Sequence, residues 1–203
     1  MPAGSGGLVA PTGLTFGSDN NLYVASLISS EVKRYNGQTG EFINTFVPYS
    51  SGGLMNGATG LTFGSDNNLY VSSISGRFAG NSNRNSSVLR YDGQTGAFID
   101  AFVPANSGGL DDPAGLAFGP DNNLYVNSNF SNSVLRYSGK TGAFIDAFVT
   151  SGSGGLSSPN IGLIFFPTPV PEPPCGLDLL AFSALGIVSV LKRKQKSGWC
   201  CKK

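Results

Sequence analysis

One pattern occurs three times in this sequence, and it limits the folds that the chain can adopt. In the copy at residues 113–149, short runs of aromatic, aliphatic and β-branched residues alternate with clusters of Gly, Asn, Asp, Ser and Pro. The runs are Gly115–Phe118, Leu124–Asn127, Val134–Tyr137 and Ala143–Val149. Because the intervening residues suit the positive or fixed φ angles of tight turns, the pattern predicts four β-strands joined by short connections.

The copies repeat at a period typical of propeller blades. They lie at residues 11–47, 57–103 and 113–149. The S-G-G-L sequences that precede them begin at Ser5, Ser51 and Ser107, with a fourth at Ser153, so the spacings are 46, 56 and 46 residues. Four-stranded blades of β-propellers repeat at about this length. The longest spacing contains nine extra residues between Tyr70 and Val88, so one loop is longer while the strands keep their order.

The predicted fold class is all-β. The last run of each copy is apolar on both faces, with Phe42, Phe98 and Phe144 on one face and Ile43, Ile99 and Ile145 on the other. A sheet of this kind must be covered on both faces, as stacked blades cover one another. We therefore predict a partial β-propeller of three four-stranded blades, at about residues 9–48, 57–104 and 113–150, plus a C-terminal single transmembrane helix.

The blades belong to an expected propeller domain at residues 1–166. It ends in an incomplete fourth blade at 153–166, where a lone strand at 162–166 stops before Pro167. Propellers typically have four to eight blades, so three blades leave two apolar flanks open to water. We expect self-association with another copy, or a chain that is a truncated, non-functional fragment of a longer propeller protein.

The repeated pattern resembles the NHL repeat, whose blades combine a P-x-G-[IL] strand with an [IL]-Y-V strand. The matching segments are Pro11–Leu14 with Leu22–Ala25, Gly60–Phe63 with Leu69–Val71, and Pro113–Leu116 with Leu124–Val126. The resemblance covers about three quarters of the chain and implies a propeller fold. Because NHL-like propellers serve as binding and enzymatic scaffolds alike, it does not identify a function.

The sequence changes character after Phe166. Residues 167–174 form a Pro-rich linker, and residues 175–191 form an apolar run of 17 residues with one charge, Asp178. This length is at the short limit for a membrane-spanning helix, which we expect at about 176–194. A basic cluster follows, made of Lys192, Arg193, Lys194 and Lys196. Basic residues mark the cytoplasmic side, so the propeller is expected outside the cell.

The linker, the apolar run and the basic cluster together resemble a PEP-CTERM sorting signal at residues 175–196 with the motif Val170, Pro171, Glu172 and Pro173 before it. The resemblance implies export in a bacterium, processing by an exosortase-type enzyme and a place in the cell envelope. Two features depart from the family: residues 197–203 follow the basic cluster, and residues 1–7 lack the pattern of a signal peptide. A proline linker before an ordinary tail anchor is the alternative.

Charge and composition exclude several classes of protein. Residues 1–166 contain seven Lys and Arg against ten Asp and Glu, so no basic patch for nucleic acid is expected. They contain no cysteine, and the whole chain contains no histidine, so no metal or other cofactor is expected. Propeller lactonases need a metal held by Glu, Asn and Asp, and streptogramin lyases depend on histidine. With no histidine and only Glu31, Glu41 and Glu172 as glutamates, the chain can assemble neither arrangement, so the sequence predicts that the protein is not an enzyme.

Two polar positions recur in the blades. Asp19, Asp66 and Asp121 precede Asn-Asn and are expected to cap turns, because the loop offers too few oxygens for a calcium ion. Arg34, Arg90 and Arg136 precede a tyrosine in each copy. They are expected to bridge to neighbouring backbone or to acids such as Asp100 and Asp146.

The predicted binding face lies at the loops between the second and third strands. Its residues are Arg77, Phe78 and Arg84 in the long loop of the second blade, and Asn127, Asn129 and Phe130 in the third. Such a mixture suits a polysaccharide or a protein ligand; a tolerated insertion is the alternative. Together these features predict an exported, surface-anchored binding or structural module, with a lactonase- or lyase-type propeller enzyme as a further alternative.

Removal of residues 75–83 tests this binding face. The deletion shortens the insertion toward the length found in the other blades, so the chain should fold as before while attachment to the cell surface or matrix is lost. Circular dichroism checks the fold, and a cell-attachment assay checks the loss. A shortened protein that attaches as well as the parent would place the binding face elsewhere.

Overall fold

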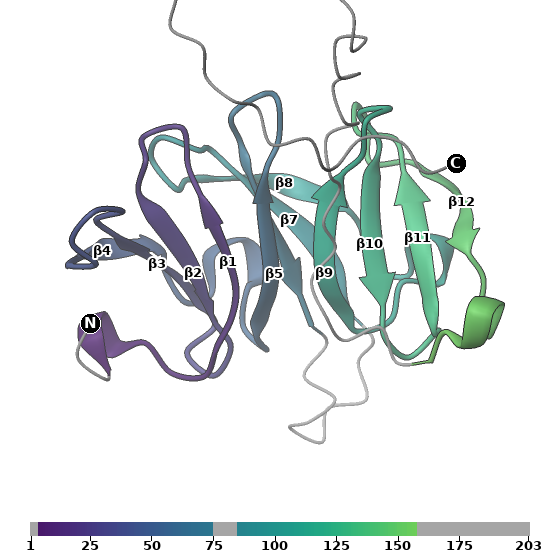
Figure 1. The fold of residues 1–203 in the computed structure, drawn as a ribbon, viewed down its shortest axis with the longest axis horizontal. Coiled ribbons are helices and arrows are strands. Elements are labelled where there is room, and N and C mark those ends of the chain that lie inside the picture. The colour runs from purple at the N-terminus through teal and green to yellow at the C-terminus, as the bar shows by residue number, and fades with distance from the viewer. Residues whose placement is uncertain (1–3, 75–84, 158–203) are drawn as a thin grey trace, which may run out of the picture. The chain divides into compact units, whose positions relative to one another are not determined.

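A computed structural model of the 203-residue chain describes residues 4–74 and 85–157, which belong to one compact unit, Met1–Pro167. In the described residues, twelve strands form three four-stranded antiparallel sheets, each with its strands in chain order (Figure 1). This arrangement confirms the all-β prediction and fits a partial propeller. We refer to the sheets as blades 1, 2 and 3.

Each blade has the same element lengths. Blade 1 contains β1 (Pro11–Phe16), β2 (Leu22–Ser26), β3 (Glu31–Tyr35) and β4 (Phe42–Val47). Blade 2 contains β5 (Ala58–Phe63), β6 (Leu69–Ser73), β7 (Ser87–Tyr91) and β8 (Phe98–Val103). Blade 3 contains β9 (Pro113–Phe118), β10 (Leu124–Ser128), β11 (Ser133–Tyr137) and β12 (Phe144–Val149). The repeated Ser-Gly-Gly forms 3-10 turns: η1 (Ser5–Gly7), η2 (Ser51–Gly53), η4 (Ser107–Gly109) and η5 (Ser153–Gly155).

The predicted lone strand at 162–166 and the C-terminal helix at 176–194 lie outside the described residues. Within residues 4–74 and 85–157, no helix is long and apolar enough to cross a membrane. The sorting motif at 170–173 and the basic cluster at 192–196 also lie outside this part of the chain.

The turn between the first two strands of each blade follows directly from its sequence. Asn20, Asn67 and Asn122 have φ angles of 60°, 61° and 59°, a left-handed conformation that asparagine tolerates. The aspartate that precedes each of these asparagines accepts a hydrogen bond from the backbone. Asp66 Oδ1 lies 3.1 Å from the Asn68 nitrogen, and Asp19 and Asp121 repeat the contact. The predicted role of the three aspartates as turn caps is confirmed.

The innermost strands β1, β5 and β9 lie side by side (Figure 1). The Thr12 hydroxyl donates to the Thr59 carbonyl at 2.9 Å, and the Thr59 hydroxyl donates to the Pro113 carbonyl at 2.7 Å. The backbones come so close that a Cβ on Gly60 would collide with the carbonyl oxygen of Ala114. Glycine is therefore required where one inner strand passes the next.

The hydrophobic core consists of two clusters, one at each junction between blades. At the first junction, Tyr23 of blade 1 lies edge-on between Phe46 of its own blade, at 4.8 Å, and Phe63 of blade 2, at 5.0 Å. At the second, Tyr70 lies between Phe102 at 4.9 Å and Phe118 at 5.0 Å. Edge-to-face aromatic pairs of this kind stabilise a core beyond the effect of burial.

The outer strands are less covered than the sequence pattern predicts. The expectation of apolar residues covered on both faces is wrong at the start of β4, β8 and β12, where the phenylalanines and isoleucines are 39–44% exposed. They are Phe42, Phe98, Phe144, Ile43, Ile99 and Ile145. The outermost strand has no further strand beyond it, and neighbouring blades cover only its second half, where Phe46 and Phe102 are buried.

Candidate functional site

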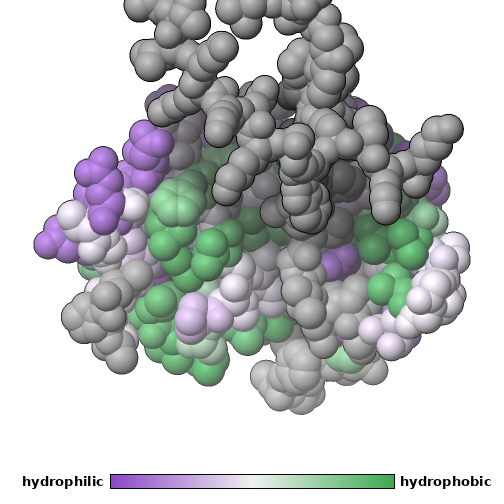
Figure 2. Space-filling model, in the orientation of Figure 1, coloured by the Kyte–Doolittle hydropathy of each residue, from purple (hydrophilic) through white to green (hydrophobic). Residues whose placement is uncertain are grey.

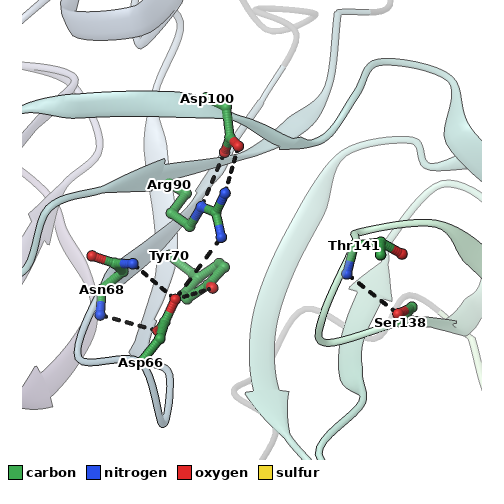
Figure 3. A network of polar contacts seen from close by, with 7 residues as sticks. All are labelled: Asp66, Asn68, Tyr70, Arg90, Asp100, Ser138 and Thr141. Carbon is green, nitrogen blue, oxygen red and sulfur yellow. Dashed lines mark hydrogen bonds and ion pairs between the residues drawn. The ribbon is translucent and has the colours of Figure 1, made fainter.

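A network of polar side chains occupies one end of each blade, where the turns between its first two strands and between its last two strands meet. In blade 2, the Tyr70 hydroxyl donates to Asp66 Oδ2 at 2.9 Å (Figure 3). Arg90 makes a two-pronged contact with Asp100, at 3.1 Å through Nε and 2.6 Å through Nη2. Its Nη1 lies 3.9 Å from Asp66 Oδ2, and its guanidinium lies 5.0 Å from the ring centre of Phe102.

The other blades repeat this network with one change. In blade 3, Arg136 pairs with Asp146 at 2.6 Å, so the predicted pairing of the repeated arginines with Asp100 and Asp146 is confirmed in both blades. In blade 1, Asn44 replaces the acid, and Arg34 Nε donates to Asn44 Oδ1 at 3.2 Å. Sequence analysis missed that the tyrosine and the turn aspartate belong to the same network.

The network sets the ionisation of its members. Burial acts to raise the pKa of Asp66, but hydrogen bonds from Asn68 and Tyr70 and the charge of Arg90 outweigh burial and lower the pKa below its ordinary value. Burial raises the pKa of Tyr70 to about 12. At neutral pH the site therefore presents an ionised carboxylate beside a neutral phenol and a guanidinium.

A groove of about 410 Å³ opens between blades 2 and 3 beside the blade 2 network. Its lining from blade 2 comprises Ser65, Asp66, Tyr70 and Arg90. Its lining from blade 3 comprises Phe118, Asp121, Asn122, Asn123, Ser138, Gly139 and Lys140. Figure 3 shows the blade 2 network beside the turn that carries Ser138 and Thr141 between β11 and β12. The volume lies in the range of small-ligand sites in proteins.

The groove is lined by hydrogen-bond donors and acceptors next to the aromatic ring of Phe118. Asp66 and Asp121 are acceptors with side chains 40% and 37% exposed, and the Lys140 ammonium and Arg90 guanidinium are donors. In the part of the chain that the structure describes, no three His, Cys, Asp or Glu residues come together to hold a metal ion. This lining can bind a ligand rich in hydroxyl groups.

The structure describes three residues of the predicted binding face, and they lie at the end of blade 3 opposite the polar network. Asn127 and Asn129 are buried, and the Asn129 amide donates to the Asp112 carboxylate at 3.1 Å. Phe130 is 40% exposed. Arg77, Phe78 and Arg84 lie outside the described residues.

No protein-family model and no curated protein sequence matches the chain. Its structure is similar to a gluconolactonase from Xanthomonas campestris, with a TM-score of 0.54 and 18% identity over 69% of this chain and 48% of that one. It is also similar to a catalytically inactive virginiamycin B lyase from Staphylococcus aureus (TM-score 0.51, 17% identity, 70% and 43%) and to a streptogramin B lyase (0.50, 20%, 73% and 43%).

These likenesses define the class of fold: the described residues form three blades of a β-propeller. The chain spans less than half the length of each of these solved structures. Their identities of 17–20% support the fold and do not carry an activity across.

The prediction excluded enzymatic activity, and the comparison with solved structures contradicts that exclusion. Solved structures that share its fold include a gluconolactonase and lyases, which are enzymes. The prediction used the absence of histidine and the scarcity of glutamate, which argue against two particular catalytic arrangements and not against catalysis on this fold. The groove lies between blades and uses aspartate, arginine and lysine, which that argument did not consider.

The raised pKa of Tyr70 predicts a loss of stability at high pH. The folded protein holds the phenolic proton more tightly than the unfolded chain does, because burial raises the pKa from 10.0 to about 12. The stabilisation is complete below pH 10 and should fall as the pH rises to about 12. Urea unfolding from pH 9 to 12 measures it, and Tyr70→Phe should make the decline smaller without abolishing it, because burial also raises the pKa of Tyr91 and Tyr137. The exposed Tyr49, replaced by Phe, is the control and should leave the slope unchanged.

Proposed function

We propose that this chain is an exported propeller module that binds a saccharide in the groove between blades 2 and 3 and is held at the cell envelope by its C-terminal segment. The observation that carries the binding role is the lining of the groove, which contains two carboxylates, two cations, two asparagines and the aromatic Phe118.

A saccharide fits this lining better than an apolar or a strongly charged ligand. Each sugar hydroxyl donates one hydrogen bond and accepts others, so it pairs with a carboxylate and a cation at the same time. Asp66 and Asp121 supply the acceptors, while Arg90 and Lys140 supply the donors, so side chains of both charges line the groove. The apolar face of a sugar ring can pack on Phe118.

Blade 3 differs from the other blades at the turn that lines this groove. Ser138 and Lys140 stand where blade 2 has Asp92 and Gln94. The change replaces an acid and an amide by a hydroxyl and an ammonium. This groove therefore has a hydroxyl group and a cationic donor that the equivalent turn of blade 2 lacks.

The location is proposed from the sequence alone. The motif at residues 170–173, the apolar run and the basic cluster support sorting to the cell envelope by an exosortase-type enzyme. A binding propeller displayed there would meet extracellular polysaccharide directly.

Binding to a panel of immobilised neutral and uronic-acid oligosaccharides tests the groove. Calorimetric titration then follows the oligosaccharide that binds best. Lys140→Gln, which restores the residue type of blade 2, and Asp121→Asn should each weaken binding at least about 10-fold, because each removes a charged hydrogen bond. Gln38→Ala changes the equivalent turn position of blade 1 and is the control. Equal binding by the groove variants and the parent would contradict the proposal.

Lactone hydrolysis is the second candidate function, favoured by the likeness to a gluconolactonase and by the two groove carboxylates. Asp66 is ionised at neutral pH and can accept a proton from water. Acid release from gluconolactone should then exceed the spontaneous rate and fall at least about 10-fold in Asp66→Asn. Asp19→Asn alters the equivalent turn of blade 1 and serves as the control. A rate equal to the spontaneous one would eliminate this candidate.

The lyase chemistry is not proposed. The Staphylococcus aureus lyase is described as catalytically inactive when one histidine is replaced by alanine. This chain has no histidine to take that role.

A further inference from the structure

Equivalent residues of the three blades differ sharply in exposure at the two ends of the array. Leu14 of β1 is 63% exposed, whereas its counterparts Leu61 and Leu116 are 6% and 4% exposed. Phe16 of β1 is 58% exposed. At the other end, Phe148 of β12 is 53% exposed, whereas Phe46 and Phe102 are 4% and 5% exposed. Figure 2 shows hydrophobic residues gathered over β1 and β2.

The difference follows from which neighbour each residue contacts. Leu61 and Phe63 pack against blade 1, and Leu116 and Phe118 pack against blade 2. Leu14 and Phe16 occupy the equivalent positions in blade 1, which has no described blade before it. We call Leu14 and Phe16 the leading flank, and Phe148 with Val149 the trailing flank.

The two flanks are the two halves of a contact that the chain already makes twice. Within the chain, a tyrosine lies between one phenylalanine of its own outer strand and one from the inner strand of the next blade. Phe148 is the blade 3 counterpart of the outer-strand phenylalanines, and its ring centre lies 4.9 Å from that of Tyr125. Phe16 is the blade 1 counterpart of the inner-strand phenylalanines. The trailing flank therefore has the shape and chemistry to receive a leading flank.

We propose that the trailing flank of one copy packs against the leading flank of a second copy, as blade 1 packs against blade 2, and that two copies close into a six-bladed ring. Each copy then uses both flanks, because the contact is head-to-tail and the ring closes after two members. Six blades lie within the usual four to eight.

The size of the solved neighbours supports two copies. Three blades of this chain align with 43–48% of the gluconolactonase and the two lyases, so two copies would supply about as much propeller as one of those chains.

One buried residue distinguishes the face of blade 1 that carries the leading flank from the equivalent faces of blades 2 and 3. Lys33 stands where blades 2 and 3 have Leu89 and Leu135. Its ammonium is held within its own blade, 2.8 Å from Glu31 and 2.9 Å from the Thr45 hydroxyl, and Lys33 is only 5% exposed. The proposed contact therefore buries no unpaired charge, but it is less apolar than the contacts inside the chain. Association between copies should accordingly be reversible.

Closing the ring would also create a second kind of groove. At the junction between copies, Asp121 and Arg136 of blade 3 would face the turn that carries Asn36 and Gln38 of the second copy. That groove repeats the carboxylate and guanidinium of the groove between blades 2 and 3 but has an amide in place of the Lys140 ammonium.

The competing occupant of the trailing flank is the same chain, whose residues 162–165 repeat the opening sequence of a blade. That segment repeats the sequence of only one of the four strands of a blade, and it does not account for the leading flank. A second copy covers both flanks, which is why we favour it.

Sedimentation velocity of the full chain, in one mild detergent throughout, tests the ring. In a ring of two Leu14→Glu chains, or of two Phe148→Glu chains, each of the two junctions contains one glutamate. Each substitution should therefore raise the dimer dissociation constant at least about 100-fold, because a charge would be buried without a partner. Both positions are more than half exposed in the single chain, so folding should be retained, as circular dichroism checks. Ile43→Glu, at a 42% exposed position outside both flanks, is the control and should leave the dimer intact.

Mixing the two variants separates this proposal from its rivals. An equimolar mixture of Leu14→Glu and Phe148→Glu contains pairs with one unaltered junction, so a dimer should reappear that neither variant forms alone. A mixture that stays monomeric would overturn the head-to-tail contact. Loss of the dimer in Leu14→Glu alone would indicate contact between two leading flanks and overturn it too. Variants that both behave as the parent would show that the flanks are not the interface.

Discussion

The packing of one tyrosine between phenylalanines of two adjacent blades is the contact on which the described structure depends. A four-stranded sheet is a single layer and cannot bury its apolar faces alone. Tyr23 and Tyr70 solve this by joining their own outer strand to the inner strand of the next blade. The core is therefore made of junctions, and a blade without a neighbour on one side leaves half a junction exposed.

The same tyrosines connect the core to the polar site. Each ring lies in the junction while its hydroxyl group reaches the turn aspartate, as the Tyr70 hydroxyl reaches Asp66. The arginine stacked on the neighbouring phenylalanine completes the network and pairs with an acid of the outer strand. Packing between blades thus fixes the geometry of the charged groups, and the groove between blades 2 and 3 is a consequence of that packing.

Strong repetition makes the differences between blades informative. Lys33 replaces a leucine on the face of blade 1 that no described blade covers, and Lys140 replaces a glutamine at a turn that lines the groove between blades 2 and 3. Both changes lie where a blade has an environment that the other blades lack. They mark the two surfaces at which this chain is proposed to bind a partner: a flank for a second copy of the chain and a groove for a saccharide.

The sequence by itself determined the strands, the turns and the grouping into blades, because these depend on local signals such as alternating apolar residues and Asp-Asn-Asn turns that repeat at nearly constant spacing. It also indicated neighbouring backbone or acids such as Asp100 and Asp146 as partners of the repeated arginines, and the antiparallel register of the structure places these acids opposite Arg90 and Arg136. Only the tertiary structure decided which apolar residues are covered and where the groove lies. Asp66 and Lys140 are 74 residues apart, and Leu14 differs in sequence context little from Leu61, so their surroundings depend on which blades are neighbours.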